Sequence, residues 1–185
     1  SDKDAAGNAY PTIDGITSGV SRYPDMSATA LIEAIAGHHD VAPEQVAVGA
    51  GSVEVVGQIA SAVVDAGDDV VFGWRAFEAY PIITTVVGGN AVKVPLRDHV
   101  HDLDAMAAAV TDRTRLVIVC NPNNPTSTAV GAELVDFVDG LRDDVLVVVD
   151  EAYHHYADPT EVPDALAAFR GRPNVVVTRT FSKAF

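Results

Sequence analysis

Lys183 stands near the end of the sequence, a short polar turn after the three valines at 175–177. The valines predict a buried strand, and a lysine just beyond such a strand is held rigidly close to solvent. An amine that is desolvated there loses its proton more readily and can form a Schiff base with a carbonyl compound. Lysine is also an ordinary surface residue, so the other polar groups of the chain must decide between the two roles.

Asp150 and Glu151 end the most strongly apolar run of the chain, at residues 145–149. Adjacent side chains on an extended chain point to opposite sides, so we do not expect these two carboxylates to act as an acid/base pair. A single buried carboxylate at a strand end can instead accept a hydrogen bond from a ring N–H and keep a cationic ring protonated. The run also resembles the metal-side motif of P-loop ATPases, but no phosphate loop of that class accompanies it.

Two turns offer further groups for binding a ligand. Residues 49–52, Gly-Ala-Gly-Ser, lead into a predicted helix, whose first backbone N–H groups and dipole suit a phosphate. Glu54 occupies the third glycine position of a dinucleotide fingerprint and no Gly-Lys-Ser/Thr follows, so a plain strand-to-helix turn is the alternative. Residues 121–126, Asn-Pro-Asn-Asn-Pro-Thr, form a rigid loop in which an Asn is suited to hydrogen-bonding a ligand oxygen.

The other reactive residue types give weaker signals. The histidines at 38–39, 99–101 and 154–155 lack the spacing of a metal site, so we predict exposed or loop histidines and no metal. Cys120 ends an apolar run and is interpreted as a small strand-end residue rather than a nucleophile. The aromatic residues predicted to line the core or a cleft, where one of them could stack on a planar cofactor, are Trp74, Phe77 and Tyr80.

Short apolar runs alternate with helical patterns along most of the chain. Strands are predicted at 70–72, 91–94, 116–120, 145–149 and 175–177. Helices are predicted at 27–36, 52–66, 77–87, 102–110, 131–141 and 163–169. Ser27 is the expected N-cap of the first helix and Gly37 its stop. The fold class is therefore α/β, with a mostly parallel sheet covered on both faces, and its ligands are expected beyond the carboxyl ends of the strands.

Composition excludes several classes of partner. The formal net charge is -14, which argues against nucleic acid and anionic membranes as partners. No apolar run approaches the roughly 20 residues of a membrane helix, and the polar residues 1–10 do not form a signal peptide. The single cysteine fits a reducing compartment. We therefore expect a cytoplasmic protein that binds small molecules.

Taken together, these segments resemble the pyridoxal-phosphate aminotransferases of fold type I, most closely the histidinol-phosphate and aromatic (phenylalanine) aminotransferase branch. The matching segments occur in family order at 21–24, 49–52, 77–80, 121–126, 150–153 and 180–183. The resemblance implies a three-layer αβα fold, with an N-terminal arm at 1–26 and a partial large cofactor domain at 27–185. It also implies that these residues correspond to the N-terminal half of a larger protein, without its small C-terminal domain.

The resemblance implies a role for each matching residue. Lys183 forms the Schiff base with pyridoxal 5'-phosphate and moves the proton at the substrate Cα, while Asp150 pairs with the pyridine N–H. Asn124 and Tyr153 bind the phenolic oxygen of the ring, and Phe77 stacks on the ring. The groups implied to hold the phosphate are the amides of Ala50, Gly51 and Ser52, the hydroxyls of Thr180 and Ser182, and Tyr23 of a neighbouring subunit. A site shared in this way implies a homodimer.

The implied activity is transfer of an amino group between an aromatic amino acid and a 2-oxo acid such as 2-oxoglutarate. The bulky aromatic residues of segment 73–80 favour an aromatic substrate. Histidinol phosphate is the alternative substrate, and a non-catalytic module of the same fold, or a lyase or decarboxylase with the same cofactor, stays open. Ser127 departs from the family pattern, which usually has glycine there, and a serine favours a different backbone conformation for this turn.

Overall fold

The computed structural model describes residues 23–184, so residues 1–22 of the predicted arm and Phe185 lie outside the described part. The chain divides into two compact units, Ser1–Val48 and Gly49–Phe185. The first unit contains helix α2 (Thr29–His39) and the 3-10 turn η1 (Pro43–Gln45). The domain boundary predicted between residues 26 and 27 stays a prediction.

Helix α2 differs from its prediction at both ends. Ser27 is not its N-cap, because the Asp25 carboxylate accepts the backbone N–H of Thr29 at 2.8 Å and takes over that task. Gly37 does not end the helix either, and α2 continues to His39. A glycine inside a helix costs only about 1 kcal/mol relative to alanine, which one more turn of hydrogen bonds offsets.

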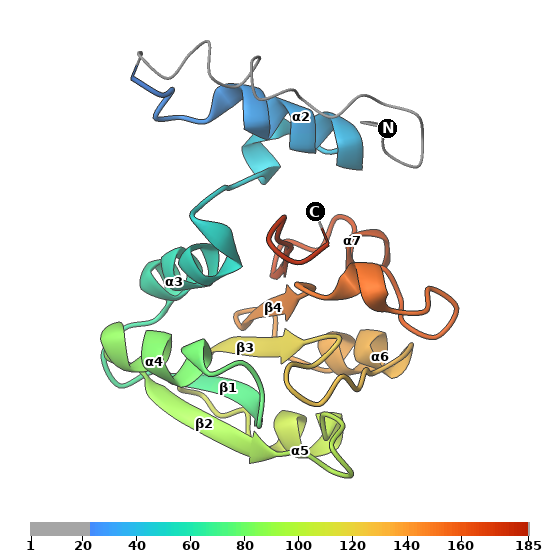
Figure 1. Cartoon of the computed structure of the whole chain (residues 1–185). Helices are drawn as coiled ribbons and strands as arrows, with labels where there is room; N and C mark the ends of the chain where they lie inside the picture. The colour runs from blue at the N-terminus through green and yellow to red at the C-terminus, as the bar shows by residue number, and fades with distance from the viewer. Residues whose placement is uncertain (1–22, 185) are drawn as a thin grey trace. The chain divides into compact units, whose positions relative to one another are not determined.

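The second unit is built on a five-stranded sheet in which every neighbouring pair is parallel (Figure 1). Its strands are β1 (Asp69–Trp74), β2 (Asn90–Pro95), β3 (Thr114–Cys120), β4 (Leu146–Asp150) and β5 (Val175–Thr178). They lie in the order β2-β1-β3-β4-β5, so the chain runs outward from β1 to β2 and then returns past β1 to β3. The carboxyl ends of β1, β3, β4 and β5 therefore meet at one edge of the sheet, which confirms the predicted parallel sheet.

Helices connect the strands of this unit. They are α3 (Gly51–Val63), α4 (Ala79–Val86), α5 (Leu103–Ala108), α6 (Glu133–Asp139) and α7 (Ala165–Ala168), with a 3-10 turn η2 (His154–Tyr156) after β4. Each α-helix is shorter than predicted, because apolar residues such as Val110 and Leu141 still pack on the core after the helix has ended. No described helix is both long and apolar enough to cross a membrane.

Separate apolar cores cover the two faces of the sheet. The helix residues of the first core, from α3 and α4, are Val56, Ala60 and Tyr80. The helix residues of the second core, from α5, α6 and α7, are Met106, Leu134, Phe137, Val138 and Ala165. Along β3, Ile118 faces the first core while Val117 and Val119 face the second. The three-layer αβα arrangement is thereby confirmed for the second unit.

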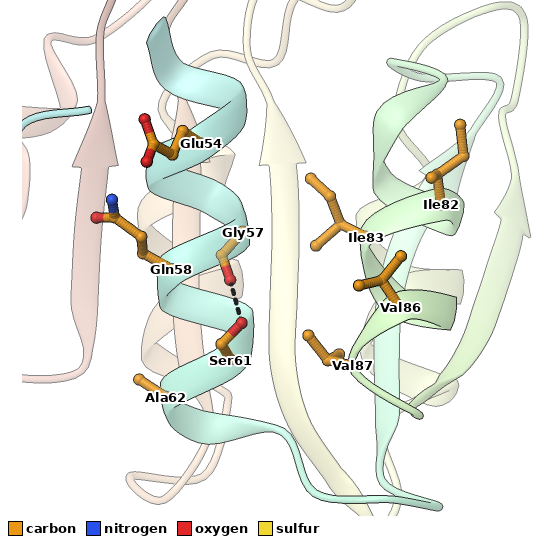
Figure 2. Close-up of a pocket in the computed structure, with 9 residues that line it drawn as sticks. All are labelled: Glu54, Gly57, Gln58, Ser61, Ala62, Ile82, Ile83, Val86 and Val87. Carbon is orange, nitrogen blue, oxygen red and sulfur yellow. Dashed lines mark hydrogen bonds between the residues drawn. The ribbon is translucent and has the colours of Figure 1, made fainter. Parts of the chain in front are cut away.

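An open groove lies between α3 and α4 (Figure 2). Its lining residues are Glu54, Gly57, Gln58, Ser61, Ala62, Ile82, Ile83, Val86 and Val87. The Ser61 hydroxyl is turned back into α3, where it donates to the Gly57 carbonyl at 2.8 Å. None of the predicted site residues belongs to this lining, but Glu54 at one end of the groove binds the backbone N–H of Ala50.

Candidate active site

Asp150 is a buried carboxylate at the carboxyl end of β4, with 3% of its surface exposed. The Tyr80 hydroxyl donates to its Oδ2 at 2.7 Å. Its Oδ1 accepts the Thr178 hydroxyl at 3.1 Å and the backbone N–H of Ala152 at 3.2 Å. Three donors from α4, β5 and the turn after β4 therefore fix the carboxylate in one orientation.

The surroundings of Asp150 act on its charge in opposite directions. Burial raises the pKa of the Asp150 carboxyl, while the bonds from Tyr80 and Thr178 and the charge of Lys183 lower it. Burial and the Asp150 charge raise the pKa of Tyr80 well above its ordinary value, so this hydroxyl keeps its proton and remains a donor. A carboxylate placed in this way gains most from a cationic or N–H-bearing partner that enters from the site.

Glu151 points to the opposite side of the chain, as predicted for the residue next to Asp150. Its carboxylate accepts Arg179 Nε at 2.8 Å and the backbone N–H of Ala165 at 3.0 Å. Glu151, His154 and Asp164 lie close enough together to share a metal ion. The Arg179 guanidinium, however, already binds both carboxylates, at 2.7 Å from Glu151 and 2.9 Å from Asp164. The cluster is therefore an ion-pair network that ties β4 to α7 and to the segment after β5.

Lys183 lies beyond β5, and its side chain is exposed rather than desolvated. Its Nζ lies 5.3 Å from the centre of the Tyr153 ring, and its carbonyl accepts the Tyr156 hydroxyl at 2.7 Å. Both tyrosines follow β4, so the turn after β4 supports the turn after β5. The ammonium is also near enough to lower the pKa of Asp150, although burial dominates that shift.

A cavity of about 800 Å³ brings several of these turns together. The residues predicted for the site that line it are Asn124, Tyr153 and Lys183. In the loop after β3, Asn121 is used internally, since its side chain exchanges hydrogen bonds of 2.9 and 3.0 Å with Val130. Asn123 likewise donates to the Arg75 carbonyl at 3.0 Å. Asn123 and Asn124 both line the cavity, and within the described part of the chain the Asn124 side chain has no such partner in the loop.

Ser127 closes the same loop. Its backbone N–H donates to the Asn123 carbonyl at 2.8 Å, and its φ is 59°. This is the left-handed region that glycine favours, so the different conformation expected for serine is not found. The turn keeps the glycine-like shape and accommodates the serine in it.

The turn at the start of α3 has the features expected of an anion site. Ala50 is the N-cap of α3, Gly51 has a φ of 79°, and Ser52 is half-buried in the first turn. The backbone N–H of Ala50 is bound by the carboxylate of Glu54. A carboxylate folded back onto this amide indicates that the helix start attracts negative charge.

The remaining predicted residues are placed as follows. Thr180 and Ser182 lie on either side of Phe181, and their hydroxyls share a hydrogen bond of 2.8 Å. Phe77 is half-buried and packs edge-on against Tyr80, with ring centres 5.7 Å apart. Tyr23 belongs to the first unit and is fully exposed. The roles given to these residues, as to the others of the site, stay predictions.

Sequence patterns did not identify two partners of Asp150. Tyr80 was expected only to line the core or a cleft, yet its hydroxyl reaches the carboxylate. Thr178 was not singled out, although a threonine after three valines at the end of β5 pairs in register with Asp150. The sequence did offer one signal: Tyr80 and Thr178 each place a hydroxyl at the end of an otherwise apolar segment. A buried hydroxyl needs a hydrogen-bond partner, so both could have been expected to have one.

His101 is a loop histidine, as predicted, but it is buried rather than exposed. Its ring is 5% exposed, and its Nε2 lies 2.9 Å from the Cys120 carbonyl. Burial lowers the pKa of the His101 imidazole. Cys120 itself is buried and its pKa is raised to about 12, so it is a protonated thiol, as expected of a strand-end residue.

Comparison with known proteins gives a consistent result. A family model described as aminotransferase class I and II matches residues 5–185. An aromatic amino acid aminotransferase of Rhodococcus jostii (strain RHA1) is 56% identical over 167 residues, covering 89% of this chain and 46% of that protein. One from Thermobifida fusca (strain YX) is 53% identical, covering 90% and 46%.

A solved structure agrees with the sequence relatives. Histidinol-phosphate aminotransferase from Sinorhizobium meliloti, in complex with pyridoxal-5'-phosphate, has a TM-score of 0.85 and 32% identity. The match covers 99% of this chain and 51% of that one. The chain therefore spans about half the length of the relatives that it matches.

Proposed function

Because this chain belongs to the class I and II aminotransferase family, we propose that the protein containing it is an aromatic amino acid aminotransferase. It would move an amino group between an aromatic amino acid and a 2-oxo acid such as 2-oxoglutarate, with pyridoxal 5'-phosphate as cofactor. The observation that carries this proposal concerns Asp150, a buried carboxylate that accepts three hydrogen bonds. It lies at the same sheet edge as Lys183, Asn124 and Tyr153.

The residues present suit this cofactor. Asp150 offers a buried negative charge to a ring N–H, and the cavity lined by Asn124, Tyr153 and Lys183 is large enough for a small planar molecule. The amides proposed to hold the phosphate, at Ala50, Gly51 and Ser52, lie at the start of α3. In this structure the Ala50 N–H donates to the Glu54 carboxylate and the Gly51 N–H to the Gly49 carbonyl at 2.8 Å, so a phosphate would take over these two donors. Thr180 and Ser182 add two hydroxyls to the set of phosphate donors that we propose.

Pyridoxal phosphate, when bound, supplies an aldehyde that accepts an amino group and a ring that withdraws electrons. The protein would supply orientation and proton control. Asp150 would hold the proton on the ring nitrogen, because its ionised form is bonded by three donors. Lys183 Nζ would take the proton from the substrate α-carbon, and Asn124 and Tyr153 would orient the ring through its phenolic oxygen.

The cavity favours an aromatic amino acid over histidinol phosphate. Besides Lys183, its charged lining residues are Glu133, Asp158 and Glu161. A phosphate monoester that entered there would meet three carboxylates and one amine, whereas an aromatic side chain would meet the Tyr153 and Tyr156 rings. The relatives named above as aromatic amino acid aminotransferases point the same way. Histidinol phosphate remains the second candidate, on the strength of the Sinorhizobium structure.

The proposal extends to assembly and location. The protein would form a homodimer with shared sites, in which Tyr23, an exposed residue of the first unit, would reach the phosphate of the neighbouring subunit. The buried, protonated Cys120 is compatible with a reducing cytoplasm.

An amino-transfer assay tests the proposed function. The full-length protein containing this chain, loaded with pyridoxal phosphate, should transfer the amino group of phenylalanine or tyrosine to 2-oxoglutarate faster than that of histidinol phosphate. Lys183→Ala should lower kcat by about 10³-fold or more, since it removes a general base. Lys93→Ala, on β2, should leave kcat unchanged.

Other outcomes would support the alternatives. A faster reaction with histidinol phosphate would replace the aromatic substrate. Binding of the cofactor with release of carbon dioxide or ammonia, but no transfer, would indicate a decarboxylase or lyase. A protein that binds no pyridoxal phosphate, and in which borohydride attaches no cofactor to Lys183, would be a non-catalytic module.

A further inference from the structure

Tyr80 joins the apolar core under α4 to the carboxylate of the site. Its ring packs edge-on against Phe72 and Phe77, with centres 5.8 and 5.7 Å away. The side chain is 1% exposed, so its hydroxyl cannot turn to solvent. That hydroxyl reaches across 70 residues of sequence to Asp150 Oδ2, at 2.7 Å.

The Tyr80 hydroxyl is not needed to fill space. A phenylalanine would occupy the same apolar pocket, and burying a hydroxyl costs free energy unless it is hydrogen-bonded. The bond is short and its acceptor is ionisable, which places it among the stronger hydrogen bonds of a protein. The hydroxyl therefore acts on the carboxylate rather than on the packing.

The two oxygens of Asp150 are used unequally. Each carboxylate oxygen can accept about two hydrogen bonds. Among the described residues, Oδ1 has two donors, Thr178 and the Ala152 amide, whereas Oδ2 has Tyr80 alone. Oδ2 therefore keeps one lone pair for a ligand, and Tyr80 determines the direction in which that lone pair points.

We propose that Tyr80 is a positioning residue, which aims Oδ2 of Asp150 at the ring nitrogen of pyridoxal phosphate and keeps this carboxylate ionised for it. The proposal rests on the proposed function, since it needs that cofactor in the site. Thr178 and the Ala152 amide would anchor the other oxygen, so that α4, β4 and β5 together hold the carboxylate.

The charge of Asp150 makes the proposal testable by pH. The titratable groups that act on it are Tyr80 from α4, Cys120 from β3 and Lys183 after β5. Both Tyr80 and Cys120 are protonated at neutral pH, because their pKa values are raised. The Tyr80 bond lowers the pKa of Asp150, so its removal lets the carboxyl take up a proton at a higher pH as the solution is acidified.

The experiment is a titration of the cofactor-free, full-length protein with pyridoxal phosphate across a pH series. Tyr80→Phe should weaken binding at neutral pH by about 10-fold, the effect of one charged hydrogen bond. Its loss of affinity on acidification should begin at a higher pH than in the wild type. The Asp150→Asn protein should bind pyridoxal phosphate weakly, and its affinity should not fall further on acidification. The difference from the wild type then shows which part of the pH dependence of binding comes from the Asp150 carboxyl.

A second variant covers the case in which Tyr80→Phe does not fold. Incorporation of 3-fluorotyrosine at position 80 keeps the ring and the bond but makes the hydroxyl a stronger donor, so the acid-side loss should move to a lower pH. A Tyr80→Phe protein with wild-type affinity and an unshifted acid-side loss would overturn the proposal. Failure of the wild type itself to bind pyridoxal phosphate would instead refute the proposed function.

Discussion

At the scale of single residues, Ser127 shows how a loop can keep a shape that its side chain opposes. A residue with a Cβ in the left-handed region costs roughly 1–2 kcal/mol relative to its favoured conformations. The loop tolerates this cost because the bond from Ser127 N–H to the Asn123 carbonyl closes the turn that presents Asn124. The strain is therefore local to the residue.

Ser127→Gly should raise the free energy of unfolding by about 1 kcal/mol, since glycine has no Cβ to strain at this φ. The measurement is the thermal unfolding midpoint of the cofactor-free protein. Ser61→Gly is the matched control, because the same change inside α3 should lower stability by a similar amount. Equal effects of the two changes would show that the Ser127 conformation carries no strain.

The residues of the site could be predicted unequally from the sequence. That Asp150 and Glu151 diverge follows from extended backbone alone, and the structure gives them partners on opposite sides, Tyr80 and Arg179. The Tyr80–Asp150 bond could not be predicted, because it depends on how α4 lies over the sheet rather than on any local pattern. The burial of the loop residue His101 could not be predicted for the same reason, since it depends on how this loop packs against β3.

At the scale of elements, β1 and the loop before α5 are packed against each other at one glycine. A Cβ added to Gly73 would lie 2.1 Å from His101 Nδ1. The ring cannot move away easily, since its Nε2 is bound to the Cys120 carbonyl and the side chain is buried. The absence of a side chain at Gly73 is what lets His101 join β1 to β3.

Gly73→Ala should therefore lower the free energy of unfolding by about 1–3 kcal/mol, as overpacking does in other cores. Gly57→Ala is a control of opposite sign, because nothing lies within 4 Å of the added Cβ and α3 gains helix propensity. Urea unfolding followed by circular dichroism would give both values. Full stability in the Gly73→Ala protein would mean that the His101 ring can shift without cost.

Element types were easier to predict than element ends. The apolar runs identified all five strands of the sheet, because strands buried on both faces are apolar throughout. The order β2-β1-β3-β4-β5 had no signature in the runs, since any strand of this composition can pair with any other. Helix α2 shows a further limit, because the capping carboxylate came from Asp25, outside the predicted helix.

At the scale of the whole molecule, buried His101 links stability to pH. Its pKa is lowered by burial, which the bond to the Cys120 carbonyl only partly opposes. The unfolded chain, with a histidine pKa of about 6.5, therefore binds a proton at a pH where the folded protein does not. The stability that depends on neutral His101 is complete above about pH 6.5 and is lost as the pH falls below it.

The wild-type unfolding midpoint should accordingly fall between about pH 7 and pH 5, and His101→Gln should flatten this decline. Glutamine can still donate to the Cys120 carbonyl but does not titrate. His99→Asn, at an exposed position with a φ of 69°, should keep the wild-type decline. A steep decline that survives in His101→Gln would assign the pH dependence to other groups.

The three bonds to Asp150 also set a time order for making the site. Tyr80 precedes the carboxylate by 70 residues and Thr178 follows it by 28. A ribosome that adds about 5–20 residues per second would release α4 several seconds before β4, and β5 later still. A nascent chain would thus display the tyrosine before any carboxylate exists to accept its hydrogen bond. A chain whose β5 has not yet left the ribosome would hold the Asp150 carboxylate without the bond from Thr178.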